Sequence, residues 1–487
     1  RMKDGELEQT LPDTLWPGGG TACYLKGYAR SATPLKSLEL EAPGLDATLA
    51  SRVYPHLHGI DKCCDDANPK ACLMSAFTSL LKVSDKTDPA TYRYTLNARF
   101  GGKDTRSLAS TELTVSDSRP VEATVIPFAG SESGQRCVIC MATYEPGMET
   151  FRRQIESIRA QTHKSWHCII NDDGSSDETL ARCREVIGDD ERFSIYRNQP
   201  NVGFYKNFET ALMRVPNNVD FVALSDQDDD WYPDKLESCL NAFNEKTQLV
   251  YCDMQIVNEQ GEVLADTYWK NRRNNYQDAH VLFLANTVTG AASVFRRELL
   301  DDILPFPQPV GQVFHDHWIA CVARCRGELG YVDRPLYDYY QYGTSVIGHC
   351  DFEHVGVLEG ATGLIERAKD IPGMGRFKSV LVSIRNKSIN IYHNEYLRLH
   401  LFAVILDMRM PGMNPSARRE LTMFADNWRA VWRMLYAHLR IKFAGDTTYN
   451  AELRLAASVL AFKAERMLVR LFAGRLVRKH CRRSTAE

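Results

Sequence analysis

The sequence predicts an α/β chain in which a mainly parallel sheet occupies residues 136–350, after a β-sandwich at 1–135 and before a helical region at 351–487. Three observations support this prediction. Short alternating apolar stretches fill the first part, apolar strands alternate with amphipathic helices in the second, and strand patterns vanish in the third. At 487 residues the chain also exceeds one compact core, so several domains are expected.

The first part has the pattern of a small sandwich. Gly, Pro and Asp separate short alternating segments, which is typical of antiparallel strands joined by turns. The clearest segments are residues 22–28, 37–40, 92–100 and 111–115. The polar stretch Ser-Glu-Ser-Gly-Gln at 131–135 suits a linker to the next domain.

The central part alternates strands with helices. Residues 138–141 and 167–170 are apolar strands, and residues 148–161 between them carry apolar side chains at helical spacing. Further strands are expected at 221–224 and 249–252. Because ligands of such sheets bind beyond the carboxyl ends of strands, chemistry is expected at those ends.

The last part is helical and basic. Residues 428–487 hold 13 Lys or Arg against 4 Asp or Glu, a local charge of +9 in a chain whose net charge is −3. Apolar residues from Leu453 to Phe472 are interleaved with basic ones, so this stripe could enter an anionic lipid interface. The alternative, an amphipathic helix docked on its own catalytic domain, stays equally open.

Composition limits the classes of partner and compartment. The net charge of −3 excludes a globally basic nucleic-acid binder. The 14 cysteines are scattered, which favours reduced thiols in the cytoplasm. Cys137 and Cys140 are interpreted as structural residues of a buried strand, and the group Cys63, Cys64 and Cys72 as ordinary thiols rather than zinc ligands.

No apolar stretch is long enough to span a bilayer, and residues 1–8 lack the apolar core of a signal peptide. The expectation is therefore a cytoplasmic protein, with peripheral contact at the inner face of the cell membrane left open by the basic C-terminus.

Polar motifs follow the first two strands of the central part. Thr143, Tyr144 and Glu145 end one strand, and Asp173 lies in the Asn-Asp-Asp-Gly-Ser run at 171–175 that ends the next. A carboxylate there can accept hydrogen bonds from a nucleobase or ribose, and adjacent helix N-termini favour phosphate. Taken alone, Asp-Gly-Ser is a common turn.

The third motif is acidic. Five carboxylates fall between Asp226 and Asp234, directly after an apolar strand. Their repulsion needs neutralising cations, and such oxygen ligands suit Mg²⁺ or Mn²⁺ bridging a diphosphate. A solvated acidic loop is the alternative, although the buried strand before it and the Trp-Tyr-Pro after it favour a fixed setting.

Together, in this order, these motifs resemble the family 2 glycosyltransferases, whose Rossmann-like fold is called GT-A, over roughly residues 136–348. The resemblance implies that Thr143, Tyr144 and Asp173 hold the nucleotide, that Asp228 binds the metal, and that Asp226 holds ribose or metal. Glu145 is assigned to the same donor pocket, where the family commonly has Asn. Residues 201–207 resemble the segment that runs beside the donor.

The family also has a carboxylate that accepts the proton of the acceptor hydroxyl. The run His-Asp-His-Trp at 315–318, which follows Thr-Gly-Ala-Ala at 289–292, resembles this element and implies that Asp316 is the general base. Two alternatives are a His-x-His metal site and an Asp that caps the following helix.

The segment at 339–348 resembles the closing element of the family, but Tyr340 and Tyr342 stand where Arg and His are frequent. His349 or a Tyr hydroxyl could take over a contact to metal or phosphate.

The implied activity is inverting, metal-dependent transfer of a sugar from a nucleotide-sugar donor to a saccharide or lipid-linked saccharide. The narrower resemblance is to rhamnosyl and related transferases of bacterial surface-polysaccharide and O-antigen assembly, which implies dTDP-rhamnose or a UDP-sugar. A carbohydrate-binding or scaffolding protein that has lost catalysis remains the alternative. A processive synthase is disfavoured because the sequence lacks spanning segments and a Gln-x-x-Arg-Trp element.

Overall fold

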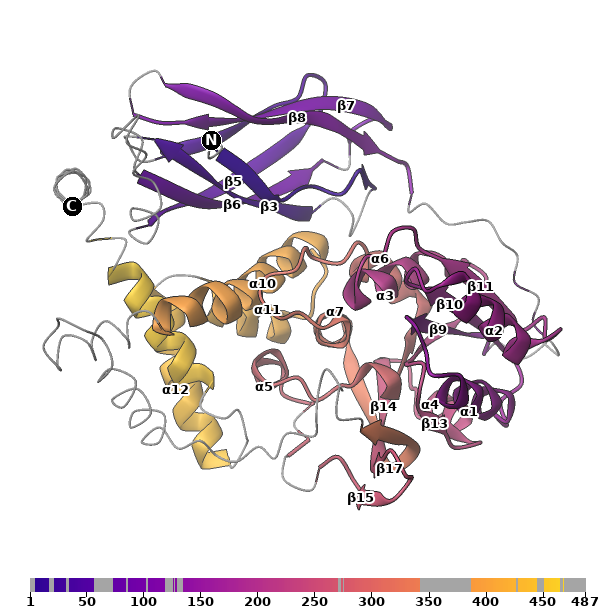
Figure 1. Cartoon of the computed structure of the whole chain (residues 1–487). Coiled ribbons are helices and arrows are strands. Elements are labelled where there is room, and N and C mark those ends of the chain that lie inside the picture. Colours follow the sequence, from indigo (N-terminus) through magenta and orange to yellow (C-terminus); the bar gives the residue numbers. More distant parts are fainter. Residues whose placement is uncertain are drawn as a thin grey trace, which may run out of the picture.

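The computed structural model places two layers of strands above a large α/β body with helices at one side (Figure 1). It describes residues 5–16, 22–31, 35–56, 73–84, 86–101, 104–118, 126, 128, 135–269, 273–274, 276–341, 387–425, 428–444, 451–464 and 467. The predicted linker at 131–134, the cysteines at 63, 64 and 72, and residues 342–386 lie outside this part of the chain.

Two four-stranded sheets form the N-terminal part. One has the order β1 (Gly5–Gln9), β3 (Ala22–Ser31), β6 (Leu73–Val83) and β5 (Ala47–His56), and the other β2 (Thr14–Leu15), β8 (Thr105–Val115), β7 (Ala90–Arg99) and β4 (Ser37–Glu41). Alternate side chains of both sheets meet in one apolar core, for example Leu25 and Phe77 with Leu96 and Leu113. The four strand segments expected from the sequence lie in β3, β4, β7 and β8.

The central sheet is mixed, with the strand order β11-β10-β9-β12-β16-β14-β17-β13 and β15 paired to β14. Its first four strands are parallel: β11 (Phe193–Arg197), β10 (Trp166–Asp172), β9 (Cys137–Thr143) and β12 (Phe221–Ser225). The others are β16 (Ser293–Arg296), β14 (Thr247–Asn258), β17 (Glu328–Gln341), β13 (Asp230–Trp231) and β15 (Val263–Ala265).

β14 and β17 are also parallel, so four of the eight strand pairings that the structure describes are parallel and the prediction of a mainly parallel sheet holds for half of them. β16 pairs antiparallel with both β12 and β14, and β13 pairs antiparallel with β17. Short apolar strands carry no signal for direction, because direction depends on the connection that returns each strand to the sheet.

Helices cover this sheet. They are α1 (Met148–Arg159), α2 (Asp177–Ile187), α3 (Phe204–Met213), α4 (Lys235–Asn241), α5 (Ala279–Leu284), α6 (Leu300–Ile303) and α7 (His315–Arg326), with short 3₁₀ turns at Gly290–Ala292 and Arg297–Leu299. α1 forms where the helical spacing predicted it and buries Phe151, Ile155 and Ile158. Cys137 and Cys140 are buried free thiols of β9, as predicted.

The C-terminal helices share the core of the central sheet. A π-turn at Tyr392–Tyr396 leads into α10 (Leu397–Arg409), followed by α11 (Pro415–Leu421), a 3₁₀ turn at Thr422–Phe424, and α12 (Trp428–Ala444). Phe402 of α10 packs on Trp318 of α7, with ring centroids 5.0 Å apart. The helical residues 451–464 pack inward through Leu455, Val459 and Phe462, whereas Leu460 and Met467 of the predicted stripe are 39% and 58% exposed. Both interpretations of that stripe stay predictions.

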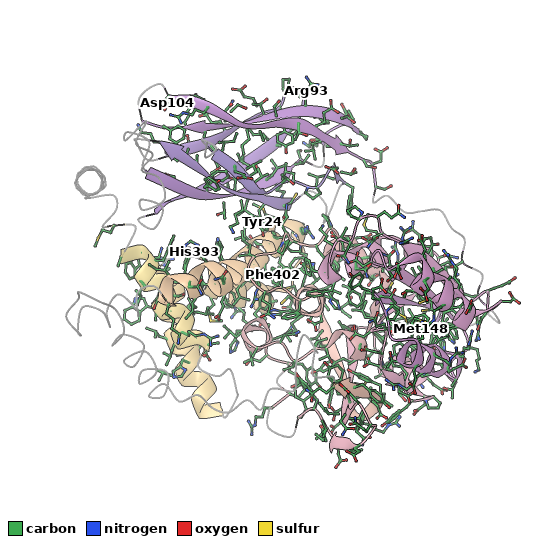
Figure 2. The ribbon with its side chains drawn as sticks, viewed as in Figure 1. Tyr24, Arg93, Asp104, Met148, His393 and Phe402 are labelled. Carbon is green, nitrogen blue, oxygen red and sulfur yellow. The ribbon has the colours of Figure 1, made fainter. Side chains whose placement is uncertain are left out.

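β3 joins the N-terminal sheets to the rest of the molecule. The Gln308 Nε2 donates to the carbonyls of Tyr24 and Thr10, at 2.7 and 3.0 Å. Tyr24 is buried in the same core as the central sheet and lies between β3 and the α10 side of the body (Figure 2). The domain boundaries at 135 and 350 remain predictions.

Within the described residues, no helix combines the length and apolar character needed to cross a membrane.

Candidate active site

Three parallel strands bring the predicted motifs to one edge of the sheet. Asp172 at the end of β10 pairs with Thr143 at the end of β9, and Ser225 of β12 pairs with Met141 of β9. Because parallel strands end at the same edge, the residues after each strand become neighbours. The acidic loop that starts at Asp226 therefore lies beside the first two motifs.

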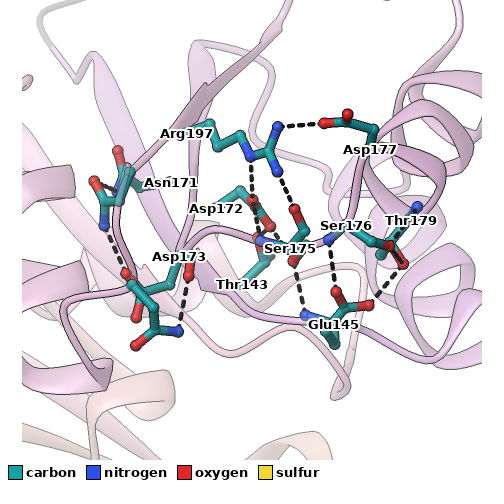
Figure 3. A network of polar contacts seen from close by, with 12 residues as sticks. Thr143, Glu145, Asn171, Asp172, Asp173, Ser175, Ser176, Asp177, Thr179 and Arg197 are labelled. Atoms are coloured by element: carbon teal, nitrogen blue, oxygen red, sulfur yellow. Dashed lines mark hydrogen bonds and ion pairs between the residues drawn. The ribbon is translucent and has the colours of Figure 1, made fainter.

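Buried polar contacts hold the first two motifs rigid (Figure 3). The Asp172 carboxylate accepts from the Ser175 backbone N–H at 2.9 Å and from the Thr143 hydroxyl at 3.4 Å. Arg197 lies on the other side of this carboxylate and also pairs with Asp177 at 2.6 Å. Thr143 and Asp172 thus fix the shape of the strand ends.

Asp173 binds the neighbouring loop. Its carboxylate accepts from Asn198 Nδ2 at 2.9 Å, from the Val202 N–H at 2.9 Å and from the Gly203 N–H at 2.8 Å. Gly203 has a φ of 82°, a left-handed conformation suited to glycine, and directly precedes α3. Asp173 therefore shapes the 198–203 loop, and its predicted contact to the nucleotide stays a prediction.

Glu145 caps a helix. One carboxylate oxygen accepts from the Ser176 N–H at 2.6 Å and the other from the Thr179 hydroxyl at 2.7 Å, so both serve the N-terminus of α2. These hydrogen bonds, the first from Thr179, lower the pKa of Glu145. Its backbone has a φ of 39°, a conformation that needs such support in a non-glycine residue.

Replacing Glu145 by Ala is expected to lower the melting temperature and to leave nucleotide affinity nearly unchanged. The reason is that both oxygens of the carboxylate already accept hydrogen bonds at the N-terminus of α2. Glu145→Gln, which keeps an acceptor, should lose less. Thermal unfolding and nucleotide titration of both variants test this, with Glu149→Ala as the control for loss of an exposed carboxylate in a first helical turn. Weaker nucleotide binding at an unchanged melting temperature would instead favour the predicted donor contact.

Tyr144 links the first motif to the acidic loop. Its side chain is 54% exposed, and its backbone N–H donates to Gln227 Oε1 at 2.9 Å. An exposed ring held at this edge is free to stack on a planar base.

The acidic loop concentrates unfavourable charge. Burial, then the charges of Asp228 and Asp316, raise the pKa of Asp226 to about 7. Burial also raises the pKa of Asp228, and that of Asp229 far more. One Asp229 carboxylate oxygen is buried without a hydrogen-bond donor. A buried carboxylate oxygen without a donor, among several acidic side chains, fits a hard divalent cation.

Two cations beside the loop were not predicted. Lys235 is buried, donates from Nζ to the Ala291 carbonyl at 2.5 Å, and lies 3.5 Å from the centroid of the Trp231 ring. Its charge offsets part of the burial effect on the pKa of Asp226 and Asp229. The only sequence signal was a single Lys at the end of an acidic run.

The second cation is Arg153 of α1. It donates to the Asp228 carbonyl at 2.6 Å, and its guanidinium lies 3.4 Å from the centroid of the Tyr340 ring. Thus Tyr340, which stands where the family frequently has Arg, contacts the guanidinium of Arg153 from α1. Tyr342 and His349 lie outside the described residues.

Asp316 faces the same cluster from α7. Its charge contributes to the raised pKa of Asp226, so the two carboxylates lie close enough to repel each other. Burial raises the pKa of Asp316 itself to about 7. Hydrogen bonds from the backbone N–H groups of His317 and Gly290 have the opposite, smaller effect. Asn286 Nδ2 also donates to it at 3.2 Å. It lies in the first turn of α7, whose N-cap is Phe314, so it does not cap this helix.

The two flanking histidines serve packing. His315 stacks on Phe208 with centroids 3.8 Å apart, and burial lowers its pKa to about 3. His317 packs edge-on against Phe402 at 5.8 Å. Among the residues that the structure describes, neither belongs to a group of three or more His, Cys, Asp or Glu whose ligand atoms converge. Gly290 is required here, since a Cβ would lie 2.6 Å from His315 Nε2.

Comparison with known proteins agrees with this arrangement. Residues 138–304 match the family model "Glycosyl transferase family 2". A succinoglycan biosynthesis protein, ExoW, of Rhizobium meliloti is 39% identical over 108 residues, which are 21% of this chain and 31% of that protein. The dTDP-rhamnosyl transferase RfbG of Shigella flexneri is 29% identical over 227 residues, 43% of this chain and 73% of that protein.

Among solved structures, a Pyrobaculum calidifontis mannosyltransferase in complex with GDP-Man and Mn²⁺ aligns at 17% identity and a TM-score of 0.34, covering 70% of this chain and 90% of that one. At this TM-score no residue role can be transferred. The sequence match and the motifs at the strand ends agree: residues 138–304 have the sequence of glycosyltransferase family 2.

Proposed function

We propose that this protein is an inverting, metal-dependent glycosyltransferase that uses a nucleotide-sugar donor and a saccharide or lipid-linked saccharide acceptor. The observation that carries the proposal is the placement of Asp316, held by Asn286 and the Gly290 N–H, close enough for its charge to act on Asp226 of the acidic loop. A single displacement needs a proton acceptor and a charge-neutralising centre around one reacting carbon, and these two groups supply them.

Asp226 and Asp228 would hold Mg²⁺ or Mn²⁺, with the buried Asp229 behind them. When bound, the cation would neutralise charge that develops on the leaving diphosphate. Arg153 adds a fixed positive charge at the same loop, suited to phosphate oxygens. Lys235 keeps the loop folded against its own repulsion before donor and cation arrive.

Asp316 would take the proton from the acceptor hydroxyl as that oxygen attacks the anomeric carbon. A pKa near 7 suits this task, because such a carboxylate is basic enough to accept a proton and ionised in part at neutral pH. The N–H groups of His317 and Gly290, with Asn286, aim the carboxylate. No covalent intermediate is needed, so the anomeric configuration would invert.

For the donor we favour dTDP-rhamnose or a UDP-sugar, in the assembly of a surface polysaccharide. Support comes from the similarity to proteins named for rhamnosyl transfer and succinoglycan biosynthesis. Thr143, Tyr144 and Asp173 lie at the edge where the nucleotide would bind, and the paired N-terminal sheets would serve as an accessory β-sandwich domain.

The test is a screen of nucleotide sugars for thermal stabilisation and for slow donor hydrolysis, with and without Mn²⁺. We expect one donor class to stabilise the protein only in the presence of a divalent cation. A glycan-binding scaffold without catalysis, the alternative function, would show neither metal-dependent nucleotide binding nor hydrolysis.

A further inference from the structure

Helix α12 exposes its largest side chains. Trp428, Trp432 and Tyr436 are 61%, 71% and 69% exposed, and Leu439 is 55% exposed. With 3.6 residues per turn, the spacing of these four residues places them along one stripe of the helix. Single exposed apolar residues are ordinary, but a continuous stripe with two tryptophans marks an interaction surface.

The opposite face of α12 anchors the helix in the protein. Four buried side chains of this face all belong to the core shared with the central sheet; they are Ala430, Val431, Met434 and Ala437. The stripe is therefore not the side by which the helix folds onto its own chain. α12 lies in the C-terminal helical region, away from β9 and β10, whose ends carry the candidate active site (Figure 1).

Positive charge flanks the stripe. α12 contains four basic residues and no Asp or Glu. Arg429 and Arg433 are exposed, and on the helical wheel both fall beside the aromatic stripe on the same flank. Neither forms an ion pair with any residue in the described part of the chain.

We propose that α12 binds the headgroup region of an anionic lipid bilayer. Trp428, Trp432 and Tyr436 would lie at the boundary between headgroups and acyl chains, where amphipathic aromatic rings are favoured. Arg429 and Arg433 would meet lipid phosphates at the surface. The buried face keeps the helix attached to the enzyme, so the contact would be peripheral and in the plane of the membrane.

Charge favours a lipid surface over a protein partner. α12 itself carries four basic residues and no Asp or Glu in a chain of net charge −3, so the helix that presents the aromatic stripe also attracts an anionic surface. This surface is separate from the stripe predicted between Leu453 and Phe472, because it lies on α12 and not on the helical residues 451–464. It is also independent of the proposed catalysis, since a chain without transferase activity would still bind vesicles.

The experiment is flotation of the full chain with vesicles of phosphatidylcholine alone and of phosphatidylcholine with phosphatidylglycerol. We expect binding to the anionic vesicles, loss of binding in Trp428→Ala/Trp432→Ala, and an affinity about tenfold lower in Arg429→Gln/Arg433→Gln. The matched control is Val263→Ala/Leu264→Ala, which removes two apolar side chains of β15 that are 51% and 50% exposed. Circular dichroism and metal-dependent nucleotide binding verify that each variant is folded.

Three results would overturn the proposal. The first is wild-type protein that stays unbound, and the second is tryptophan variants that float as well as wild type. The third is sedimentation showing a dimer that the tryptophan variants abolish in the absence of lipid, which would assign the stripe to a second copy of the chain. Loss of nucleotide binding with intact flotation would count against the proposed function alone.

Discussion

Replacing Asp316 by Asn is expected to lower kcat for sugar transfer by roughly 10²–10⁴-fold, the usual contribution of a general base. Donor affinity should change little, because Asp316 lies on α7 and not on the strand ends that face the nucleotide. The measurement is steady-state transfer with the donor found in the screen. Asp301→Asn, which removes an exposed carboxylate from the neighbouring α6, should keep full activity.

The pH dependence adds a second readout for Asp316. A base must be ionised, so the wild-type rate should rise with pH as Asp316 loses its proton, at or below about pH 7 because a bound cation favours the charged form. The Asp316→Asn variant should lack this rise of the rate with pH.

The stability of the metal-free protein should also depend on Asp316. Its pKa is higher in the folded than in the unfolded protein, so the free energy of unfolding falls as pH rises from about 4 to 7. Asp316→Asn should therefore be more stable than wild type near neutral pH, whereas a purely structural carboxylate would leave the variant less stable.

Replacing Asp228 by Asn is expected to abolish the effect of Mn²⁺ on donor binding. Loss of a residue that hydrogen-bonds to a metal ligand typically lowers metal affinity by about 10–100-fold, so loss of a direct ligand should lower it at least as much. Isothermal titration of the nucleotide with and without Mn²⁺ measures this difference. Removing one of several like charges should also stabilise the metal-free protein, since burial and neighbouring carboxylates raise the pKa values of this loop.

The matched control for Asp228 is Asp234→Asn at the end of the same acidic run. Asp234 pairs with Arg334 at 2.5 Å, and this contact lowers its pKa, so it is already neutralised. The control should keep the full metal effect. If Asp228→Asn retained metal-dependent binding while Asp234→Asn lost it, the assignment of the metal ligands would be wrong.

The sequence predicted which motifs lie together, because their proximity depends on topology. Thr143, Asp173 and Asp226 each follow an apolar strand, and parallel neighbouring strands must end together, so motif order alone brought them to one edge. The partners of those residues were not predictable. Glu145 and Asp173 have carboxylates committed to α2 and to the 198–203 loop, contacts that arise between separate segments.

By itself the sequence determined the strand and helix periodicity, the family 2 motifs and the placement of acidic residues after buried strands. Only the tertiary structure decided that half of the sheet is antiparallel, that Lys235 and Arg153 turn toward the acidic loop, and that α12 presents Trp428 and Trp432 outward. The reason is that periodicity specifies which side chains share a face, whereas the packing of distant segments specifies which face is covered and which charge lies across from it.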